Sequence, residues 1–315
     1  MVGNTILVKH ASIVPQCAIA IEELFLEAGA PVGLYTNLLI SGSAASKLVA
    51  DPRIKGVSLT GSEAAGASVA AVAGKNLKKS VLELGGSDVF IVLEDADIDK
   101  AVDWAVIGRI SNNGETCTAS KRFVAVASIA DEFFEKLKNK LAKLVIGDPM
   151  DVNTQLGPLS SEEAAVKIAD QVQRAVKGGA KLLLGGKRVA RAGAYMEATV
   201  LTNMLPENPV YYEEFFGPVA VFFTVKDEQA AIDLANDSPF GLGGSVFTQD
   251  IERGKRVADQ IDTGMVFINH PTWTQADLPF GGTKGSGYGR ELSELGIHEF
   301  VNKKLIRVSA LGDPF

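Results

Sequence analysis

The chain of 315 residues is poor in the residue types that build metal centres and disulfide frameworks. It has two cysteines, Cys17 and Cys117, and three histidines. Two thiols are too few for a disulfide framework or a four-cysteine metal site, and the histidines add few further ligands. We therefore expect no metal centre, whereas a single reactive thiol is allowed.

The sequence also lacks clustered basic charge, long apolar runs and the layout of a secretory leader. Its 31 basic and 38 acidic residues are mixed along the chain and leave a net charge of −7, without the basic patch of a nucleic-acid-binding surface. No apolar run approaches the roughly 20 residues of a membrane-spanning helix, and the start MVGNTILVKHAS does not resemble a signal peptide. We expect no nucleic-acid partner, no membrane and a cytoplasmic location.

What the sequence does have is a regular alternation of apolar strands and amphipathic helices. Its hydrophobic share of 46% is enough for one large core or two ordinary ones. The pattern predicts, in chain order, strand TILVKH, a helix from about Pro15 to Ala28, strands LYTNLLI and GVSLTGS around a short helix, strands SVLELGG and DVFIVLE, a helix from about Ile98 to Ser111, strand KRFVAVA and a helix from about Asp131 to Leu144. This rhythm is typical of α/β proteins with parallel sheets.

Two details of the first third are informative. Only four residues precede the first strand, so no earlier element completes a doubly wound sheet. After strand GVSLTGS, Ser62 is predicted to cap an Ala-rich helix, so that a strand leads directly into a helix N-terminus, a geometry that suits an anion. Cys17 falls on the apolar face of the first helix and is expected in a core.

The second cysteine, Cys117, lies in SNNGETCTASKR after an apolar helix. Glycine, small polar residues and the basic pair Lys121–Arg122 form a setting that exposes a thiol and favours its thiolate form. A buried structural cysteine is the competing interpretation, because free cysteine is among the most buried residue types.

An acid, Glu83, lies in VLELGGSD, inside an apolar strand and directly before a Gly-Gly pair. Two glycines allow another backbone or a ligand to approach closely. Burial would raise the pKa of Glu83 towards neutrality, as a general base requires. The competing interpretation is an exposed carboxylate at a strand end, which composition alone favours.

Four motifs follow one another along the chain: ELGG with Glu83, NGETC with Cys117 thirty-four residues later, then EEFFGPV and PFGGTKGSGYGRE. In content, order and spacing they resemble the aldehyde dehydrogenase family. The resemblance covers essentially all 315 residues, and FINHPTW, DLPFGG and SGYGRELSELG are most similar to its succinate-semialdehyde dehydrogenase-like branch.

The resemblance implies a role for each residue of the pair. The thiolate of Cys117 would attack the aldehyde carbonyl, and Glu83 would activate the water that hydrolyses the resulting thioester. The backbone N–H of Cys117 would donate to the oxyanion, whereas the family's second donor, an asparagine in a Pro-Trp-Asn-Phe-type motif, has no counterpart in the sequence. Glu115 stands where a glutamine is common, and its charge is expected to raise the pKa of the thiol.

The family's cofactor-binding residues can be placed in the same way. Gly61 and Ser62 match the pair that receives the pyrophosphate, and Lys9 matches the lysine at the adenosine ribose. Glu214 and Phe216 match the residues at the nicotinamide ribose and ring; without the surrounding motif they would be an ordinary loop acid and a core phenylalanine. Leu84 completes the expected cofactor site.

The cofactor itself is expected to be NADP or NAD. Ser12 stands three residues after Lys9, where strongly NAD-preferring relatives carry a glutamate. A serine does not repel a 2′-phosphate, so NADP should be tolerated.

From the resemblance we expect an N-terminally truncated chain of α/β class. It would comprise a partial Rossmann-like NAD(P)-binding lobe (residues 1–84), an α/β catalytic lobe (85–285) and a C-terminal return segment (286–315). In that segment, NKKLIRVSA is expected to be an exposed oligomerisation strand of a homodimer or homotetramer.

Three functions remain open on the sequence. The first is NAD(P)-dependent oxidation of a small aldehyde, with succinate semialdehyde as the first candidate. The second is a non-catalytic remnant that binds nucleotide or associates with itself, and the third is a thiol esterase that needs only Cys117 and Glu83.

Overall fold

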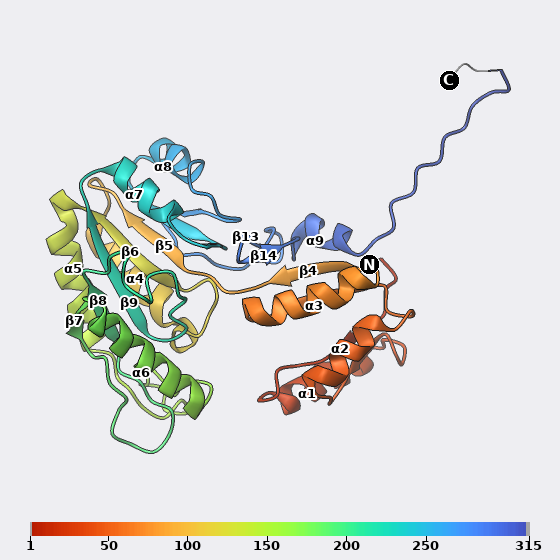
Figure 1. Cartoon of the computed structure of the whole chain (residues 1–315), viewed down its shortest axis with the longest axis horizontal. Coiled ribbons are helices and arrows are strands. Elements are labelled where there is room, and N and C mark those ends of the chain that lie inside the picture. Colours follow the sequence, from red (N-terminus) through yellow and green to blue (C-terminus); the bar gives the residue numbers. More distant parts are fainter. Residues whose placement is uncertain (1, 313–315) are drawn as a thin grey trace.

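A seven-stranded sheet dominates residues 2–312, the part of the chain that the computed structural model describes (Figure 1). In spatial order its strands are β12 (Phe267–Ile268), β11 (Gly244–Phe247), β5 (Asp88–Val92), β6 (Ser120–Val126), β9 (Val219–Val225), β8 (Thr199–Thr202) and β7 (Lys181–Leu184). Neighbouring strands are parallel except for β7, which is antiparallel to β8. The predicted α/β class is thereby confirmed.

Helices cover both faces of this sheet, because side chains of successive strand residues point to opposite sides. Phe90 and Val92 pack with α4 (Ile98–Ile110) and α5 (Ala127–Ala142). Val89 and Ile91 pack on the other face with α7 (Glu228–Asn236) and α8 (Ile251–Ala258), and α6 (Glu162–Lys177) lies over a third cluster on that side. Every residue of β5 and β6 is buried, as expected for central parallel strands.

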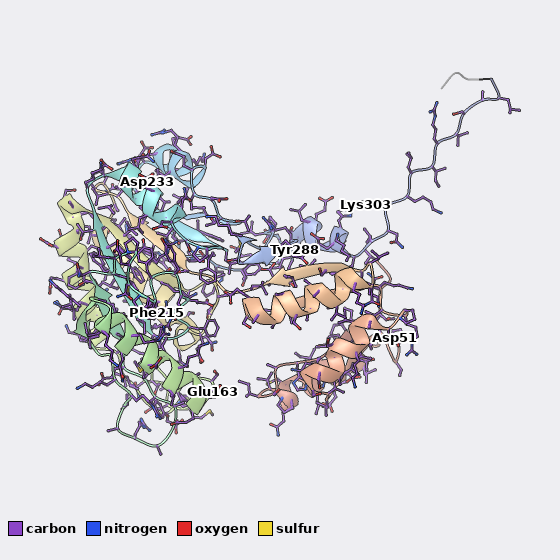
Figure 2. The ribbon with its side chains drawn as sticks, viewed as in Figure 1. Asp51, Glu163, Phe215, Asp233, Tyr288 and Lys303 are labelled. Carbon is purple, nitrogen blue, oxygen red and sulfur yellow. The ribbon has the colours of Figure 1, made fainter. Side chains whose placement is uncertain are left out.

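The first third forms two small sheets rather than one. β1 (Ile6–Val8) pairs only with β2 (Tyr35–Asn37) within the described residues, and β3 (Gly56–Thr60) pairs with β4 (Lys79–Glu83). A strand from far along the chain, β14 (Gly287–Tyr288), adds to β4 in antiparallel fashion, and the Tyr288 hydroxyl lies 2.6 Å from Ser80 Oγ (Figure 2). A further short antiparallel pair joins β10 (Phe240–Gly241) to β13 (Thr283–Lys284), which directly precedes β14 in the sequence. The strands expected to form one Rossmann-like lobe therefore lie in two separate sheets within the described chain.

Helices α1 (Pro15–Glu27), α2 (Gly42–Ala50) and α3 (Glu63–Lys75) lie beside these small sheets (Figure 1). Ser62 caps α3 as predicted, since its side chain accepts a hydrogen bond from the N–H of Ala65. The expectation for Cys17 was wrong. The cysteine is exposed, because only Ala18 of α1 is buried by the rest of the described chain.

Helix α5 begins four residues earlier than predicted, directly after β6, because Ala130 and Phe133 already pack on the sheet. Near the C-terminus, α9 (Ser293–Glu299) is followed by an extended tail that runs away from the body (Figure 1). Residues 302–310 (NKKLIRVSA) form no strand within the described chain, and Leu305 and Val308 are about nine-tenths exposed. Their pairing with another copy of the chain stays a prediction. None of the described helices combines the length and apolarity needed to cross a membrane.

The segment that connects the small sheet of β4 to the seven-stranded sheet determines where a site can form. β4 leads through four buried residues, Leu84–Ser87, straight into β5, and β5 pairs with β6 so that Asp88 lies opposite Ser120. The end of β4, which carries Glu83, and the residues before β6, which include Cys117, therefore meet at one edge.

We expect Phe133→Ala to lower the free energy of unfolding by about 3–5 kcal/mol, because the ring is fully buried between α5 and the sheet. Urea unfolding at neutral pH measures the change. Leu305→Ala, in the exposed tail, is the matched control and should change the value by less than about 0.5 kcal/mol. Equal effects of the two substitutions would contradict this assignment of the core.

Candidate active site

The loop that carries Cys117 is held in an uncommon backbone conformation. Between α4 and β6, a short 3₁₀ turn (Ser111–Gly114) places Asn112 and Asn113 at positive φ values of 50° and 57°. Asparagine tolerates this region better than most residues. The Asn113 side chain accepts from the N–H of Gly157 at 2.7 Å and donates to the carbonyl of Pro158 at 2.9 Å, which anchors the turn.

A buried arginine braces both ends of this loop. Arg109, on α4, is fully buried and donates to the carbonyls of Gly114 at 2.8 Å and Ser120 at 3.0 Å. Burial lowers the pKa of Arg109 to about 9, and the nearby carboxylates of Glu214 and Asp88 oppose that shift. Cys117 lies midway between the two braced carbonyls, so its backbone has little freedom.

The thiol of Cys117 is half-buried, and its environment disfavours the thiolate. Burial raises the pKa of Cys117 to about 11; Lys121 opposes this rise, while Asp88 and Glu214 add to it. The expectation that this setting as a whole favours the thiolate was therefore wrong, because desolvation outweighs the charge of Lys121, which acts in the predicted direction.

The carboxylate of Glu115 does not act on the thiol as expected. It accepts hydrogen bonds from the N–H and the hydroxyl of Ser160, at 2.7 and 2.6 Å. The acids that raise the pKa of Cys117 are Asp88 and Glu214, both distant from it in sequence.

Lys121, which entered the sequence prediction only as part of a basic pair, also holds Glu214, a contact that sequence reasoning missed. Its side chain is 1% exposed and forms a 3.0 Å ion pair with Glu214 Oε1. The ammonium also donates to the carbonyls of Cys117 and Thr116. A lysine near the start of a fully buried strand was the available signal, but the contact with Glu214 is made only in the fold.

Glu83 is buried, with 2% of its surface exposed, and neither carboxylate oxygen has a hydrogen-bond partner within the described residues. Burial raises the pKa of Glu83 to about 8; Glu291 adds to the shift and Arg290 opposes it. The predicted direction is confirmed, and the exposed-carboxylate interpretation is wrong. The carboxylate lies against Gly281, where an added Cβ would come within 2.8 Å of Oε1.

The two glycines after Glu83 let three segments converge. A Cβ on Gly86 would lie 2.5 Å from the carbonyl oxygen of Cys117. A Cβ on Gly85 would lie 2.5 Å from Glu63 Oε1 and 2.6 Å from Glu214 Oε2. Because neither glycine carries a side chain, the segment after Glu83 can approach the Cys117 loop and the EEFFGPV segment at the same point. The Gly86 N–H donates to Glu214 Oε1 at 3.0 Å.

Part of the predicted cofactor site gathers around this junction. The Gly61 N–H donates to the carbonyl of Glu83 at 3.0 Å, and Leu84 packs so tightly on α3 that a Cβ on Gly66 would lie 2.7 Å from its side chain. The N-terminus of α3, with Ser62, and Glu214 are thus close to the nucleophile loop.

The other three predicted cofactor residues are more open. Lys9 and Ser12 lie on the loop between β1 and α1, and no hydrogen bond joins their side chains to this junction within residues 2–312. Phe216 is 44% exposed.

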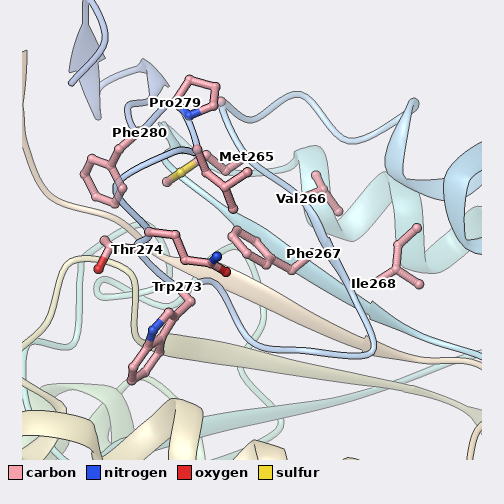
Figure 3. Close-up of a pocket in the computed structure, with 11 residues that line it drawn as sticks. Met265, Val266, Phe267, Ile268, Trp273, Thr274, Pro279 and Phe280 are labelled. Atoms are coloured by element: carbon pink, nitrogen blue, oxygen red, sulfur yellow. The ribbon is translucent and has the colours of Figure 1, made fainter. Parts of the chain in front are cut away.

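A hollow of about 420 Å³ lies beside the edge strand β12, away from the Cys117 loop. Its walls include Phe267, Trp273 and Phe280 (Figure 3), and neither Cys117 nor Glu83 lines it. His270, near it in sequence, stacks on Trp104 with ring centroids 4.3 Å apart. Among the described residues, no group of three or more His, Cys, Asp or Glu side chains is arranged to hold a metal ion.

Comparison with known proteins gives a consistent picture. The aldehyde dehydrogenase family profile matches residues 1–306. A succinate-semialdehyde dehydrogenase [NADP(+)] of Deinococcus radiodurans is 53% identical over 307 residues, which are 98% of this chain and 64% of that protein. A probable succinate-semialdehyde dehydrogenase [NADP(+)] of Synechocystis sp. is 50% identical, with 98% and 68% covered. The chain thus spans about two thirds of the length of these curated relatives.

Among solved structures, the succinic semialdehyde dehydrogenase of Streptococcus pyogenes in complex with NADP+ superposes with a TM-score of 0.95 at 48% identity. The match covers 97% of this chain and 67% of that one. A betaine aldehyde dehydrogenase of Staphylococcus aureus with NAD+ matches with a TM-score of 0.90 at 36% identity, covering 94% and 60%.

The raised pKa of Glu83 has a consequence for stability. Between the ordinary carboxyl pKa and about 8, the folded chain holds a proton that the unfolded chain releases, so stability falls as pH rises through this window. Glu83→Gln removes this penalty. We expect the free energy of unfolding of the variant, minus that of the wild type, to increase by on the order of 1 kcal/mol per pH unit between pH 5 and 8.

Urea unfolding at several pH values measures this gain. Glu23→Gln, on the exposed face of α1, is the control and should show no pH-dependent difference. A constant difference between Glu83→Gln and wild type across the range would contradict the raised pKa.

Proposed function

This chain belongs to the aldehyde dehydrogenase family, and on that premise we propose that it oxidises an aldehyde, succinate semialdehyde first, to the carboxylic acid with NADP. The observation that supports this most directly is the convergence of Cys117, Glu83 and Glu214 at Gly85–Gly86. The names of the Deinococcus and Streptococcus relatives support the choice of substrate and cofactor.

Cys117 is the nucleophile in this proposal. Its thiol loses a proton and its sulfur adds to the aldehyde carbon, which gives a thiohemiacetal whose oxygen accepts a hydrogen bond from the N–H of Cys117. When bound, the nicotinamide supplies the hydride acceptor that converts the thiohemiacetal to a thioester. Because burial raises the pKa of the thiol to about 11, attack at neutral pH requires a proton acceptor.

Glu83 is the proposed acceptor and the base for hydrolysis. With a pKa of about 8, Glu83 can release the thiol proton to solvent and then, as the carboxylate, take a proton from water near neutral pH. The resulting hydroxide adds to the thioester carbon and the C–S bond breaks; the carboxylic acid leaves, and the sulfur takes the proton back from Glu83 to restore the thiol. Both oxygens lack hydrogen-bond partners among the described residues, so no bond has to break when the base acts.

The residues at the junction fit a dinucleotide. Ser62 at the start of α3 presents a helix N-terminus for the pyrophosphate, with Gly61 before it. Glu214 uses Oε1 for protein donors and leaves Oε2 for ribose hydroxyls. Lys9 and Ser12 would face the adenosine ribose, with Phe216 beside the nicotinamide and Leu84 beneath it.

We extend the proposal to the organisation of the chain. Residues 1–84 would serve the cofactor, 85–285 would carry the chemistry, and 286–315 would form the C-terminal return segment, in which β14 pairs with β4. The apolar side chains of the exposed tail, such as Leu305 and Ile306, support pairing with another copy in a cytoplasmic dimer or tetramer.

A chain that binds nucleotide or itself without turnover is the competing function. It is favoured by exposed apolar side chains on and before α1, such as Ile13 and Leu24, each more than 60% exposed, and by the lack of the Pro-Trp-Asn-Phe-type motif. Thiol esterase activity is the third candidate, and an ester assayed without NADP separates it from the dehydrogenase.

NADPH formation with succinate semialdehyde tests the proposal. We expect Cys117→Ala to abolish it and Cys17→Ser to leave it at the wild-type level. Glu83→Gln should slow the first turnover and lower the steady rate by about 10²-fold or more, because the amide neither accepts the thiol proton nor activates the water for hydrolysis. Wild-type chain that binds NADP but shows no aldehyde-dependent NADPH would favour the non-catalytic alternative.

Ser12→Glu tests the cofactor assignment. A carboxylate at this position repels a 2′-phosphate, so we expect KM for NADP to rise by about tenfold or more while KM for NAD does not rise. Ser43→Glu, at an exposed position in α2, is the control and should leave both values unchanged. Equal effects of Ser12→Glu on the two cofactors would remove Ser12 from the site.

A further inference from the structure

Lys121 is a charged side chain in a place where charge is costly. It is the second residue of β6, and its side chain is 1% exposed. A buried ammonium is tolerated only when its donors are satisfied. Its three partners are the Cys117 carbonyl at 2.8 Å, the Thr116 carbonyl at 3.0 Å and Glu214 Oε1 at 3.0 Å. An ammonium has three N–H donors, so this set matches its full capacity.

The bond to Thr116 acts on the backbone donor of the nucleophile. The carbonyl of Thr116 and the N–H of Cys117 belong to one planar peptide unit, in which the two groups point in opposite directions. An ammonium on the oxygen side fixes the plane and increases the polarity of the unit, which strengthens the N–H as a donor. This N–H is the proposed oxyanion donor.

The third partner of Lys121 is Glu214, the carboxylate proposed to hold the ribose. Glu214 Oε1 accepts both from Lys121 and from the N–H of Gly86. Gly86 in turn touches the carbonyl of Cys117, so the nucleophile and Glu214 share two neighbours. The charge of Lys121 is divided between the carbonyls of the Cys117 loop and Glu214.

The charged groups that face this lysine and thiol come from four segments. They are Arg109 on α4, Asp88 on β5, Lys121 on β6 and Glu214 before β9. Asp88 and Glu214 raise the pKa of Cys117, and Lys121 lowers it. Burial lowers the pKa of Lys121 itself, and Glu214 opposes that shift. Among these groups, Lys121 is the cation that favours the thiolate.

We infer that Lys121 is a positioning residue that couples Glu214 to Cys117, by orienting the peptide unit before the nucleophile and by stabilising its thiolate. The inference rests on the proposed roles of Cys117 and Glu214. A lysine that only filled a polar gap in the core would affect stability without changing the titration of the thiol.

The test is the pH profile of Cys117 alkylation by iodoacetamide, which needs neither aldehyde nor cofactor. Rates are followed after pH jumps from 6 to 12 on a Cys17→Ser background, with the Cys117 peptide identified by mass. In Lys121→Met we expect the midpoint to rise by about one pH unit, which corresponds to about 1.4 kcal/mol, with the fitted high-pH plateau unchanged, so that the rate at pH 12 falls by only about twofold. Below the midpoint the rate should fall about threefold or more, because a more basic thiolate partly offsets its lower population.

Lys100→Met is the matched control, since that lysine is on the surface of α4 and pairs with Asp97. It should reproduce the wild-type profile. A changed plateau with an unchanged midpoint in Lys121→Met would mean that the lysine only shapes access to the thiol, and would overturn the inference. An unchanged profile would overturn it equally.

If circular dichroism shows that Lys121→Met does not fold, the inference is tested by the midpoint of Cys117 alkylation in Glu214→Gln. The amide keeps an acceptor for Lys121 but removes its counter-charge, so the midpoint of Cys117 alkylation should fall; an unchanged or higher midpoint overturns the inference. Failure of the proposed function is visible separately, as wild-type chain that alkylates as expected but forms no NADPH.

Discussion

The structure of this site depends on the close approach of backbones at Gly85 and Gly86. Two residues without side chains let the end of β4 touch the carbonyl of Cys117 and the carboxylate of Glu214. A Cβ on Gly86 would lie 2.5 Å from a backbone oxygen, and one on Gly85 would lie 2.5 to 2.6 Å from two carboxylate oxygens, so a larger residue would force these groups to move. The two glycines belong to Leu84–Ser87, the segment that links the small sheet to the large one. The same four residues therefore connect the two sheets and make the close contacts of the site.

Around this contact the chain buries an unusual number of charges. Arg109, Lys121, Asp88 and Glu83 are each at most 2% exposed. Burial shifts the pKa of each towards its neutral form, and the ion pairs and carbonyl contacts of the two cations partly reverse the shift. Glu83 alone has no bonded partner among the described residues, which is why its pKa is near neutral. A base and a thiol that are both uncharged at rest follow from this low-polarity setting.

Much of the fold could be predicted from local pattern. The limits of α1 and α3 and the cap at Ser62 follow from short-range physics, as do the apolar strands that became β5 and β6. What failed was a feature that depends on a neighbour. Cys17 was expected in a core because its helix face is apolar, yet the cysteine is exposed in the described chain. The strand expected over NKKLIRVSA stays a prediction, because a strand needs hydrogen bonds from another strand.

The sequence by itself determined the α/β class and the order of the four motifs, and through them the choice of Cys117 and Glu83 as the proposed nucleophile and base, because these depend on residue type and spacing. Only the tertiary structure decided their chemical state. The pKa of Cys117 is high because burial outweighs the charge of Lys121, and two acids distant in sequence, Asp88 and Glu214, add to the rise. Desolvation and long-range charge are properties of the folded arrangement, so no local pattern around Cys117 contains them.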